Sequence, residues 1–114
     1  RWLLAVNAGS NDVSVFRVRP HGLELRDVEA SGGARPVSIA VHHDLVYVVN
    51  AAGTANVSGF ALRDGDLKPI PGSTRTLSAP GAAPAQASFD PRGRVLLVTE
   101  KATNQLTTFI VRAD

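Results

Sequence analysis

The stretch from residue 34 to 68, "ARPVSIAVHHDLVYVVNAAGTANVSGFALRDGDLK", contains apolar runs separated by turn-forming residues. These runs are rich in β-branched and large apolar residues, which is typical of β-strands, and they cover 37–41, 45–50 and 56–62. Asp64-Gly65 marks a two-residue hairpin, because both central residues of a type I′ turn need positive φ. The stretch therefore predicts consecutive antiparallel strands.

A fourth strand is expected over 67–77, "LKPIPGSTRTL". It carries Pro69 and Pro71, and proline cannot donate to a ladder, so this strand should lie at a sheet edge. The run from Leu45 to Val49 is apolar on both faces. That pattern suits a sheet sandwiched between neighbouring sheets.

The same unit recurs along the chain, in segments that begin at Leu3, Val46 and Leu96. In each segment an apolar run ends in a polar residue and a small polar turn follows; the polar residues are Asn7, Asn50 and Thr99. Each second run carries a phenylalanine, and the three are Phe16, Phe60 and Phe109. A second segment also occurs twice, and its two copies have Pro36 and Pro84 near their start. We expect the three phenylalanines to be buried at equivalent positions.

The repeat predicts an all-β protein made of β-propeller blades. A four-stranded antiparallel unit of roughly 40 to 50 residues with an outer edge strand is a propeller blade. We expect a partial blade over 1–30, a full blade over 31–78 and a partial blade over 79–114, with about ten strands grouped three, four and three and little or no helix. A β-sandwich also uses short strands at this spacing, but it does not require internal similarity.

Two and a half blades make an incomplete ring, because propellers typically close with four to eight blades. The partners expected are therefore the remaining blades of a longer protein, or further copies of this chain. The chain has no Met and opens within an apolar run, "RWLLAV". This composition favours a processed chain or an excised piece.

Composition excludes several classes of function. The chain is 44% hydrophobic and 19% charged, enough to bury a core. Net charge is +2 with scattered basic residues, so no nucleic-acid partner is expected, and no apolar run is long enough to predict a membrane span. The absence of cysteine excludes disulfides and thiol catalysis, and leaves a cytoplasmic and an exported location equally open.

Three stretches resemble blades of the seven-bladed lactonase family, which includes bacterial 6-phosphogluconolactonase and the fungal carboxymuconate lactonizing enzyme. They are "APAQASFDPRGRVLLVTEKATNQLTTFIV", 83–111, "ARPVSIAVHHDLVYVVNAAGTANVSGFAL", 34–62, and "LLAVNAGSNDVSVFRV", 3–18. The resemblance implies a propeller with a pocket at its central channel. It also implies a whole protein that hydrolyses or cyclises a small acidic lactone. The alternative is a non-catalytic propeller module that binds a protein or a small molecule.

The resemblance also implies a site. Family members often end a second strand in Asn-Glu with the Glu facing the channel mouth, and Thr99-Glu100 occupies the matching place. The family's Pro-Arg-His at the start of a blade is replaced here by Pro84-Ala85-Gln86. Glu100 is therefore the candidate catalytic residue, as a base that activates water. Its alternative is a solvated turn carboxylate paired with Lys101.

Four further residues are candidates for binding an acidic ligand. Arg35 precedes a blade and could hold a carboxylate or phosphate in a bidentate way. Asn7, Asn50 and Gln86 could line the same mouth as hydrogen-bond donors, although Asn at a strand end is also a plain turn former. Strand order predicts these residues and Glu100 at one end of the sheets, with His42, His43 and Arg92 at the other.

No metal and no cofactor are expected. His42 and His43 are adjacent, and neighbours on an extended chain point to opposite faces, so they would chelate one ion poorly. His21 stands alone in a turn, and no carboxylate joins these histidines at ligand spacing. The sequence contains no phosphate-cradling glycine loop and no Gly-x-Ser-x-Gly elbow.

Overall fold

The computed structural model describes residues 1–112, and this part of the chain is all-β, with strands in three antiparallel sheets and no helix. The first sheet contains β1 (Trp2–Asn7), β2 (Asp12–Arg19) and β3 (Gly22–Ala30). The middle sheet contains β4 (Ala34–His42), β5 (Leu45–Ala52), β6 (Asn56–Arg63), β7 (Asp66–Pro69) and β8 (Arg75–Thr76). The third sheet contains β9 (Pro84–Phe89), β10 (Val95–Glu100) and β11 (Gln105–Ile110).

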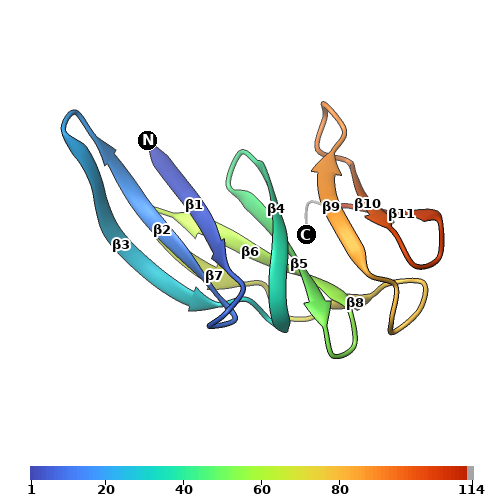
Figure 1. Ribbon diagram of the computed structural model, residues 1–114. Coiled ribbons are helices and arrows are strands. Elements are labelled where there is room, and N and C mark those ends of the chain that lie inside the picture. The colour runs from blue at the N-terminus through green and yellow to red at the C-terminus, as the bar shows by residue number, and fades with distance from the viewer. Residues whose placement is uncertain (113–114) are drawn as a thin grey trace.

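The strand order repeats from sheet to sheet. The orders are β1-β2-β3, β4-β5-β6-β7 with β8 also on β6, and β11-β10-β9. Figure 1 shows the three sheets side by side, with the first in blue at the left, the middle in green and the third in orange and red at the right. The predicted all-β fold of antiparallel, blade-like sheets is confirmed.

The fourth strand of the middle sheet differs from the prediction. The structure divides it into β7 and β8, because the chain turns between them at Gly72, whose φ is 74°. Pro71 has no N–H to give to the ladder there. Both pieces pair with β6 on the side away from β5, so the edge position predicted from the prolines is confirmed.

The register of the strands matches the sequence repeat. The three phenylalanines face equivalent residues on the preceding strand, in the pairs Leu3↔Phe16, Val46↔Phe60 and Leu96↔Phe109. Phe60 is 1% exposed, but Phe16 and Phe109 are only half-buried. The expectation of equal burial is therefore wrong. Phe60 lies in the core between the first and middle sheets, whereas within the described chain no sheet covers the face of the first sheet that carries Phe16. Phe109 packs against the other core but lines a hollow beside the edge strand β11.

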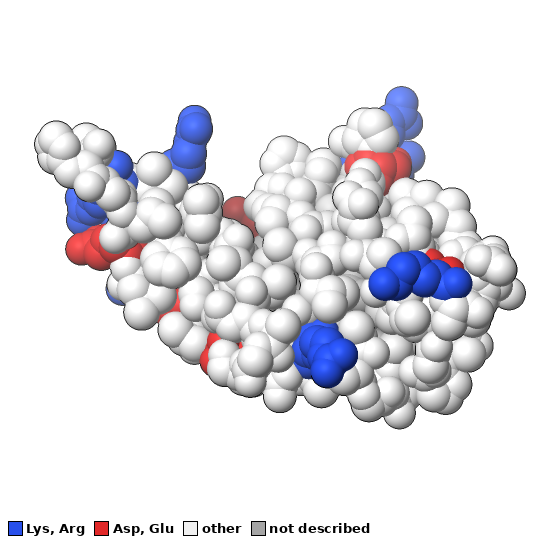
Figure 2. All heavy atoms as spheres, viewed as in Figure 1, with Lys and Arg blue, Asp and Glu red and all other residues white. Residues whose placement is uncertain are grey.

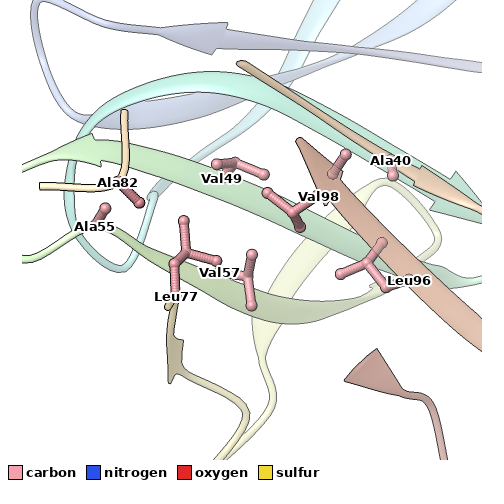
Figure 3. Close-up of a cluster of buried hydrophobic side chains, with 9 residues drawn as sticks. Ala40, Val49, Ala55, Val57, Leu77, Ala82, Leu96 and Val98 are labelled. Atoms are coloured by element: carbon pink, nitrogen blue, oxygen red, sulfur yellow. The ribbon is translucent and has the colours of Figure 1, made fainter. Parts of the chain in front are cut away.

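Two hydrophobic cores hold the sheets together, one on each face of the middle sheet. The core shared with the first sheet centres on Val13, Val15, Val46, Phe60 and Leu67. The core shared with the third sheet lies between β5–β6 and β9–β10 (Figure 3) and contains Ala40, Val49, Ala55, Val57, Leu77, Ala82, Ala87, Leu96 and Val98. The middle sheet is thus buried on both faces, as its doubly apolar second strand predicts.

The hairpin predicted at Asp64-Gly65 forms as expected, and a second tight turn joins β9 to β10. Asp64 and Gly65 have φ values of 52° and 84° and join β6 to β7 with Arg63 opposite Asp66. This geometry is the type I′ hairpin. In the turn from Asp90 to Gly93, the Gly93 N–H donates to the Asp90 carbonyl at 2.9 Å. Both turns set the register of the strands they join.

One face of the first sheet remains uncovered in the described chain. Register places Leu3, Phe16 and Leu25 side by side on this face, opposite to the valines of the core. Leu23 and Leu25 are 54% and 58% exposed. In the space-filling view, charged side chains form separate groups at the left, the upper right, the right half and the lower middle, with uncharged surface between them (Figure 2).

Candidate functional site

Three polar side chains occupy the same place in the three sheets, at the end of the strand that begins each repeat. Register pairs Asn7 with Asp12, Asn50 with Asn56 and Glu100 with Gln105. The residue equivalent to the two asparagines is therefore Glu100. The sequence comparison that ended the third apolar run at Thr99 is one residue out of register.

Glu100 is buried and fully engaged. It is 2% exposed, and its carboxylate accepts hydrogen bonds from the hydroxyls of Ser78, Thr103 and Thr107 and, at 3.2 Å, from the Ser78 N–H. Lys101 is exposed and contributes its backbone N–H to the Ala83 carbonyl. The alternative of a solvated turn carboxylate paired with Lys101 is therefore wrong.

The electrostatics of Glu100 follow from this arrangement. Burial raises the pKa of the carboxyl, but the hydrogen bonds from Ser78, Thr107 and Thr103 outweigh it and lower the pKa to about 2. Glu100 is thus ionised at neutral pH. A carboxylate with so low a pKa accepts a proton from water poorly, because a general base works best when its pKa is near the operating pH.

Asn50 is the equivalent group of the middle sheet. It is completely buried, and its Nδ2 donates to the Ser31 carbonyl at 3.0 Å and to Asn56 Oδ1 at 2.9 Å. Gly33 lies directly over it, since a Cβ at that position would fall 2.8 Å from the Asn50 Cβ. Within residues 1–112, Asn50 Oδ1 is the one buried side-chain polar atom that lacks a hydrogen-bond partner.

Asn7 is the equivalent group of the first sheet, and it is half-buried. Its Nδ2 donates to Asp12 Oδ1 at 2.8 Å and to Ser14 Oγ at 2.9 Å. Both partners come from the adjacent strand of its own sheet. Asn7 therefore differs from Asn50 and Glu100, which also reach outside their sheets.

The three groups show a repeated way of joining one sheet to the next. Asn50 binds the carbonyl of Ser31, in the connection that leaves the first sheet, and Glu100 binds Ser78, in the connection that leaves the middle sheet. Each group thus fixes the loop that arrives from the preceding sheet. Within the described chain no sheet precedes the one that holds Asn7.

Sequence reasoning missed the hydroxyls that complete these clusters. Ser14 accepts from Asn7, Ser58 donates to Asn56 Oδ1 at 3.3 Å, and Thr107 donates to Glu100. These three residues are equivalent by register. The signal was present in "DVS", "NVS" and "QLT", where a hydroxyl follows two residues after the polar partner.

Arg35 and Gln86 lie apart from these clusters. Arg35 is exposed with φ at 52°, and its backbone N–H donates to Asn11 Oδ1 at 2.7 Å. Gln86 is exposed and pairs with Thr99 in the ladder. Neither side chain has a hydrogen bond to the Glu100 carboxylate. The residues predicted for one site share an end of the sheets without forming a single cluster.

The opposite end of the sheets carries the histidines and a basic hollow. His42 pairs with Leu45 at the far end of β4 from Arg35, and its ring lies 4.3 Å from that of His43, centroid to centroid. Together with Arg92 they line a hollow of about 1110 Å³ between the middle sheet and β11. Neither this hollow nor a smaller one along β4 and β9 is lined by Glu100 or Arg35.

Two negative findings concern the described residues. No three His, Asp or Glu side chains within residues 1–112 are grouped to hold a metal ion. In the same part of the chain, no helix has the length and apolar character needed to cross a membrane.

Comparison with solved structures identifies the fold. A crystal structure of a protein from Bacteroides fragilis proposed to be a 6-phosphogluconolactonase matches 95% of this chain with a TM-score of 0.76 and 19% identity. A protein of unknown function from Desulfotomaculum acetoxidans matches 97% with a TM-score of 0.74 and 16% identity. This chain covers 34% and 37% of those two chains, about a third of each. No protein-family model and no curated protein sequence matches.

Proposed function

We propose that these sheets are blades of a lactonase-like β-propeller, and that the complete protein hydrolyses or cyclises a small acidic lactone. The observation that carries the proposal is the likeness in fold to the Bacteroides protein over 95% of this chain. In this view residues 1–30, 31–78 and 79–114 contribute a partial, a full and a partial blade. Remaining blades of a longer protein, or further copies of this chain, would close the ring.

Within this proposal, Glu100 is the candidate catalytic carboxylate, and Arg35, Asn7, Asn50 and Gln86 are candidate ligand-binding groups. Opening a lactone needs an activated water or a group that stabilises the oxyanion. Glu100 could act on water only after it exchanges hydroxyl partners for a ligand or a solvent molecule. The Asn50 Oδ1 atom, which is buried and without a partner, is a further acceptor at the same end of the sheets.

The second candidate function is a non-catalytic propeller module that binds a protein or a small molecule. Two observations favour it. The Arg and His of the family's blade-opening motif are replaced here by Ala85 and Gln86. The four hydrogen bonds to Glu100 come from the protein's own Ser78, Thr103 and Thr107, which is typical of a structural carboxylate.

Lactone hydrolysis by the full reading frame that contains this segment distinguishes the two functions. The assay compares the natural protein with Glu100→Gln and, as a matched control, with Ser78→Ala, which removes one donor to the same carboxylate and keeps the charge. Under the first proposal, Glu100→Gln loses most of its kcat and Ser78→Ala retains it. Absence of hydrolysis in the natural protein contradicts the first proposal. Equal and small losses in both variants contradict a catalytic role for Glu100.

A further inference from the structure

The strands β4 and β9 begin with the same backbone device. The residue before the proline in each has a positive φ, 52° in β4 and 53° before β9. A β-bulge follows at once in both strands. In β4, Pro36 and Ser38 pair with adjacent residues of β5. In β9, Pro84 and Gln86 pair with adjacent residues of β10. Ser38 and Gln86 therefore occupy equivalent positions, two residues after the proline.

Ser38 joins the middle sheet to the third sheet. Its Oγ accepts the Ala87 N–H at 3.0 Å. Ala40, two residues further along β4, belongs to the core shared with the third sheet, so Ser38 points to the same face. The strand β9 pairs with β10 alone in the described chain. The Ala87 N–H thus lies on the open edge of β9, and the neighbouring sheet supplies its acceptor.

Gln86 lies on the other face of the third sheet. Ala87 belongs to the core shared with the middle sheet. Because neighbouring residues of a strand point to opposite faces, the Gln86 side chain points away from the middle sheet. It is exposed, and it carries an amide oxygen that can accept a hydrogen bond.

The face that carries Gln86 repeats the face that carries Ser38. Register aligns Ser38 with Val57 across β5, and it aligns Gln86 with Leu106 across β10. Val57 is 1% exposed because the third sheet covers it, whereas Leu106 is 58% exposed. A further sheet, stacked on the third as the third is stacked on the middle, would cover Leu106 and bring an edge N–H to Gln86.

We propose that this face of the third sheet is the joint to a following sheet of the same protein, and that Gln86 accepts a backbone N–H from the inner strand of that sheet. The donor is the amide at the place that Ala87 occupies in β9. The inference rests on the proposed propeller but is independent of lactone chemistry. It makes Gln86 a residue of the joint between blades, so a ligand-binding role for Gln86 becomes an opposing outcome of the test.

Two substitutions separate an acceptor from a donor at this position. Gln86→Glu keeps an acceptor of the same length, whereas the side chain in Gln86→Lys has only donors. In the full reading frame that contains this segment, Gln86→Lys should speed hydrogen exchange of the matching amide in the following sheet by about five- to tenfold, the effect of one lost hydrogen bond. Gln86→Glu should leave that exchange slow. Any other pattern in the two variants overturns the proposal.

The joint between the middle and third sheets provides the positive control. Ser38→Ala removes the acceptor of the Ala87 N–H and should speed exchange of the Ala87 amide to the same extent. Ser88→Ala is the matched control on β9, since Ser88 is exposed and its hydroxyl contacts only the adjacent Phe89 carbonyl. Unchanged exchange of Ala87 in Ser38→Ala contradicts the proposal, because the contact that it extends would then protect nothing.

Three further measurements exclude other roles for Gln86. If Gln86 held an acidic lactone, Gln86→Glu would raise KM and Gln86→Lys would not, so a raised KM with slow exchange in both variants overturns the joint. The exchange measurement needs no activity, and failure of the lactone proposal leaves it decisive. In the 114-residue chain both variants should melt at the temperature of the natural chain, because the side chain is exposed. Lower melting of Gln86→Lys there, or loss of self-association, contradicts the proposal in favour of a local structural role or a second copy.

Discussion

Ser78 donates both its hydroxyl and its N–H to the carboxylate of Glu100, and so ties the loop that leaves the middle sheet to the end of the third sheet. One sheet earlier, Asn50 makes the equivalent link to the Ser31 carbonyl. A charged and a neutral side chain thus perform the same task at equivalent positions. The difference between them is that Glu100 accepts from donors, whereas Asn50 donates to an acceptor.

This link predicts a thermodynamic coupling between Glu100 and Ser78. Glu100→Gln should lower the free energy of unfolding by about 2 kcal/mol, because hydrogen bonds to a buried charged group are replaced by weaker ones. Ser78→Ala should cost about 1 kcal/mol, and the double variant less than the sum. Urea unfolding of the four proteins measures the coupling, with Lys101→Gln as an exposed neighbouring control. Strict additivity would show that the two residues act separately.

The low pKa of Glu100 predicts that this link weakens in acid. The folded pKa of about 2 lies below the ordinary value of 4.5, so the ionised carboxylate stabilises the fold above about pH 4.5. That contribution should fall as the pH drops from 4.5 toward 2. The difference in stability between the natural chain and Glu100→Gln should therefore shrink over this range. A difference that is constant from pH 6 to 3 would contradict the assignment.

Much of the fold could be predicted from the sequence because local signals and the repeat agree. Turn residues such as Asp64-Gly65 and Asp90-Pro91 set the hairpins, and the threefold repeat gives the pairing of Leu3 with Phe16 and of its equivalents. The break between β7 and β8 could not be predicted in the same way. The Ile70 N–H still donates to the Gly59 carbonyl at 2.9 Å, and the break follows only where the chain turns at Gly72, with φ at 74°.

The candidate site was predicted less well, because its chemistry depends on contacts between sheets. Sequence identifies Glu100 as a residue at a strand end, but its burial depends on Ser78, 22 residues earlier in the chain. The positions of Arg35 and Gln86 on separate exposed surfaces likewise follow from how the sheets stack. The repeated hydroxyls at Ser14, Ser58 and Thr107 show that alignment of the repeats could have found part of the network.

The unequal burial of the phenylalanines predicts unequal costs of truncation. Phe60→Ala should lower the free energy of unfolding by about 3 to 5 kcal/mol, because the side chain is 1% exposed in the core between two sheets. Phe16→Ala, at the equivalent but half-buried position, should cost less than half as much. Chemical denaturation of both variants tests this. Equal losses would show that Phe16 is covered in solution.

Gly53 and Gly65 have similar backbone conformations but different surroundings. Their alanine variants therefore distinguish the cost of backbone strain from the cost of steric crowding. Gly53 and Gly65 have φ values of 66° and 84°, a region that costs a residue with a Cβ about 1 kcal/mol. A Cβ at Gly65 would lie 2.5 Å from Trp2 Cη2, whereas one at Gly53 meets nothing within 4 Å. Gly65→Ala should therefore destabilise the protein by about 1 to 3 kcal/mol more than Gly53→Ala. Similar melting temperatures for the two variants would contradict the close packing of the β6–β7 turn on Trp2.

The last prediction concerns the uncovered face of the first sheet. Leu3, Leu23, Leu25 and Val28 are 42%, 54%, 58% and 47% exposed. Leu3 and Leu25 pair with Phe16 from its two sides. The residues equivalent to Leu3 in the other two sheets are Val46 and Leu96, and both are fully buried against the preceding sheet. Exposed apolar patches and open strand edges recruit other chains.

We therefore expect the 114-residue chain by itself to associate at micromolar concentration, through this face. Sedimentation velocity should show species larger than a monomer, and Leu23→Lys with Leu25→Lys should shift the chain toward monomer, because two charges would then have to be buried at the contact. Lys101→Glu, on the third sheet, should leave the association unchanged. A stable monomer that unfolds cooperatively would show that the first sheet needs no neighbour, and would favour a self-contained β-sandwich over blades of a larger propeller.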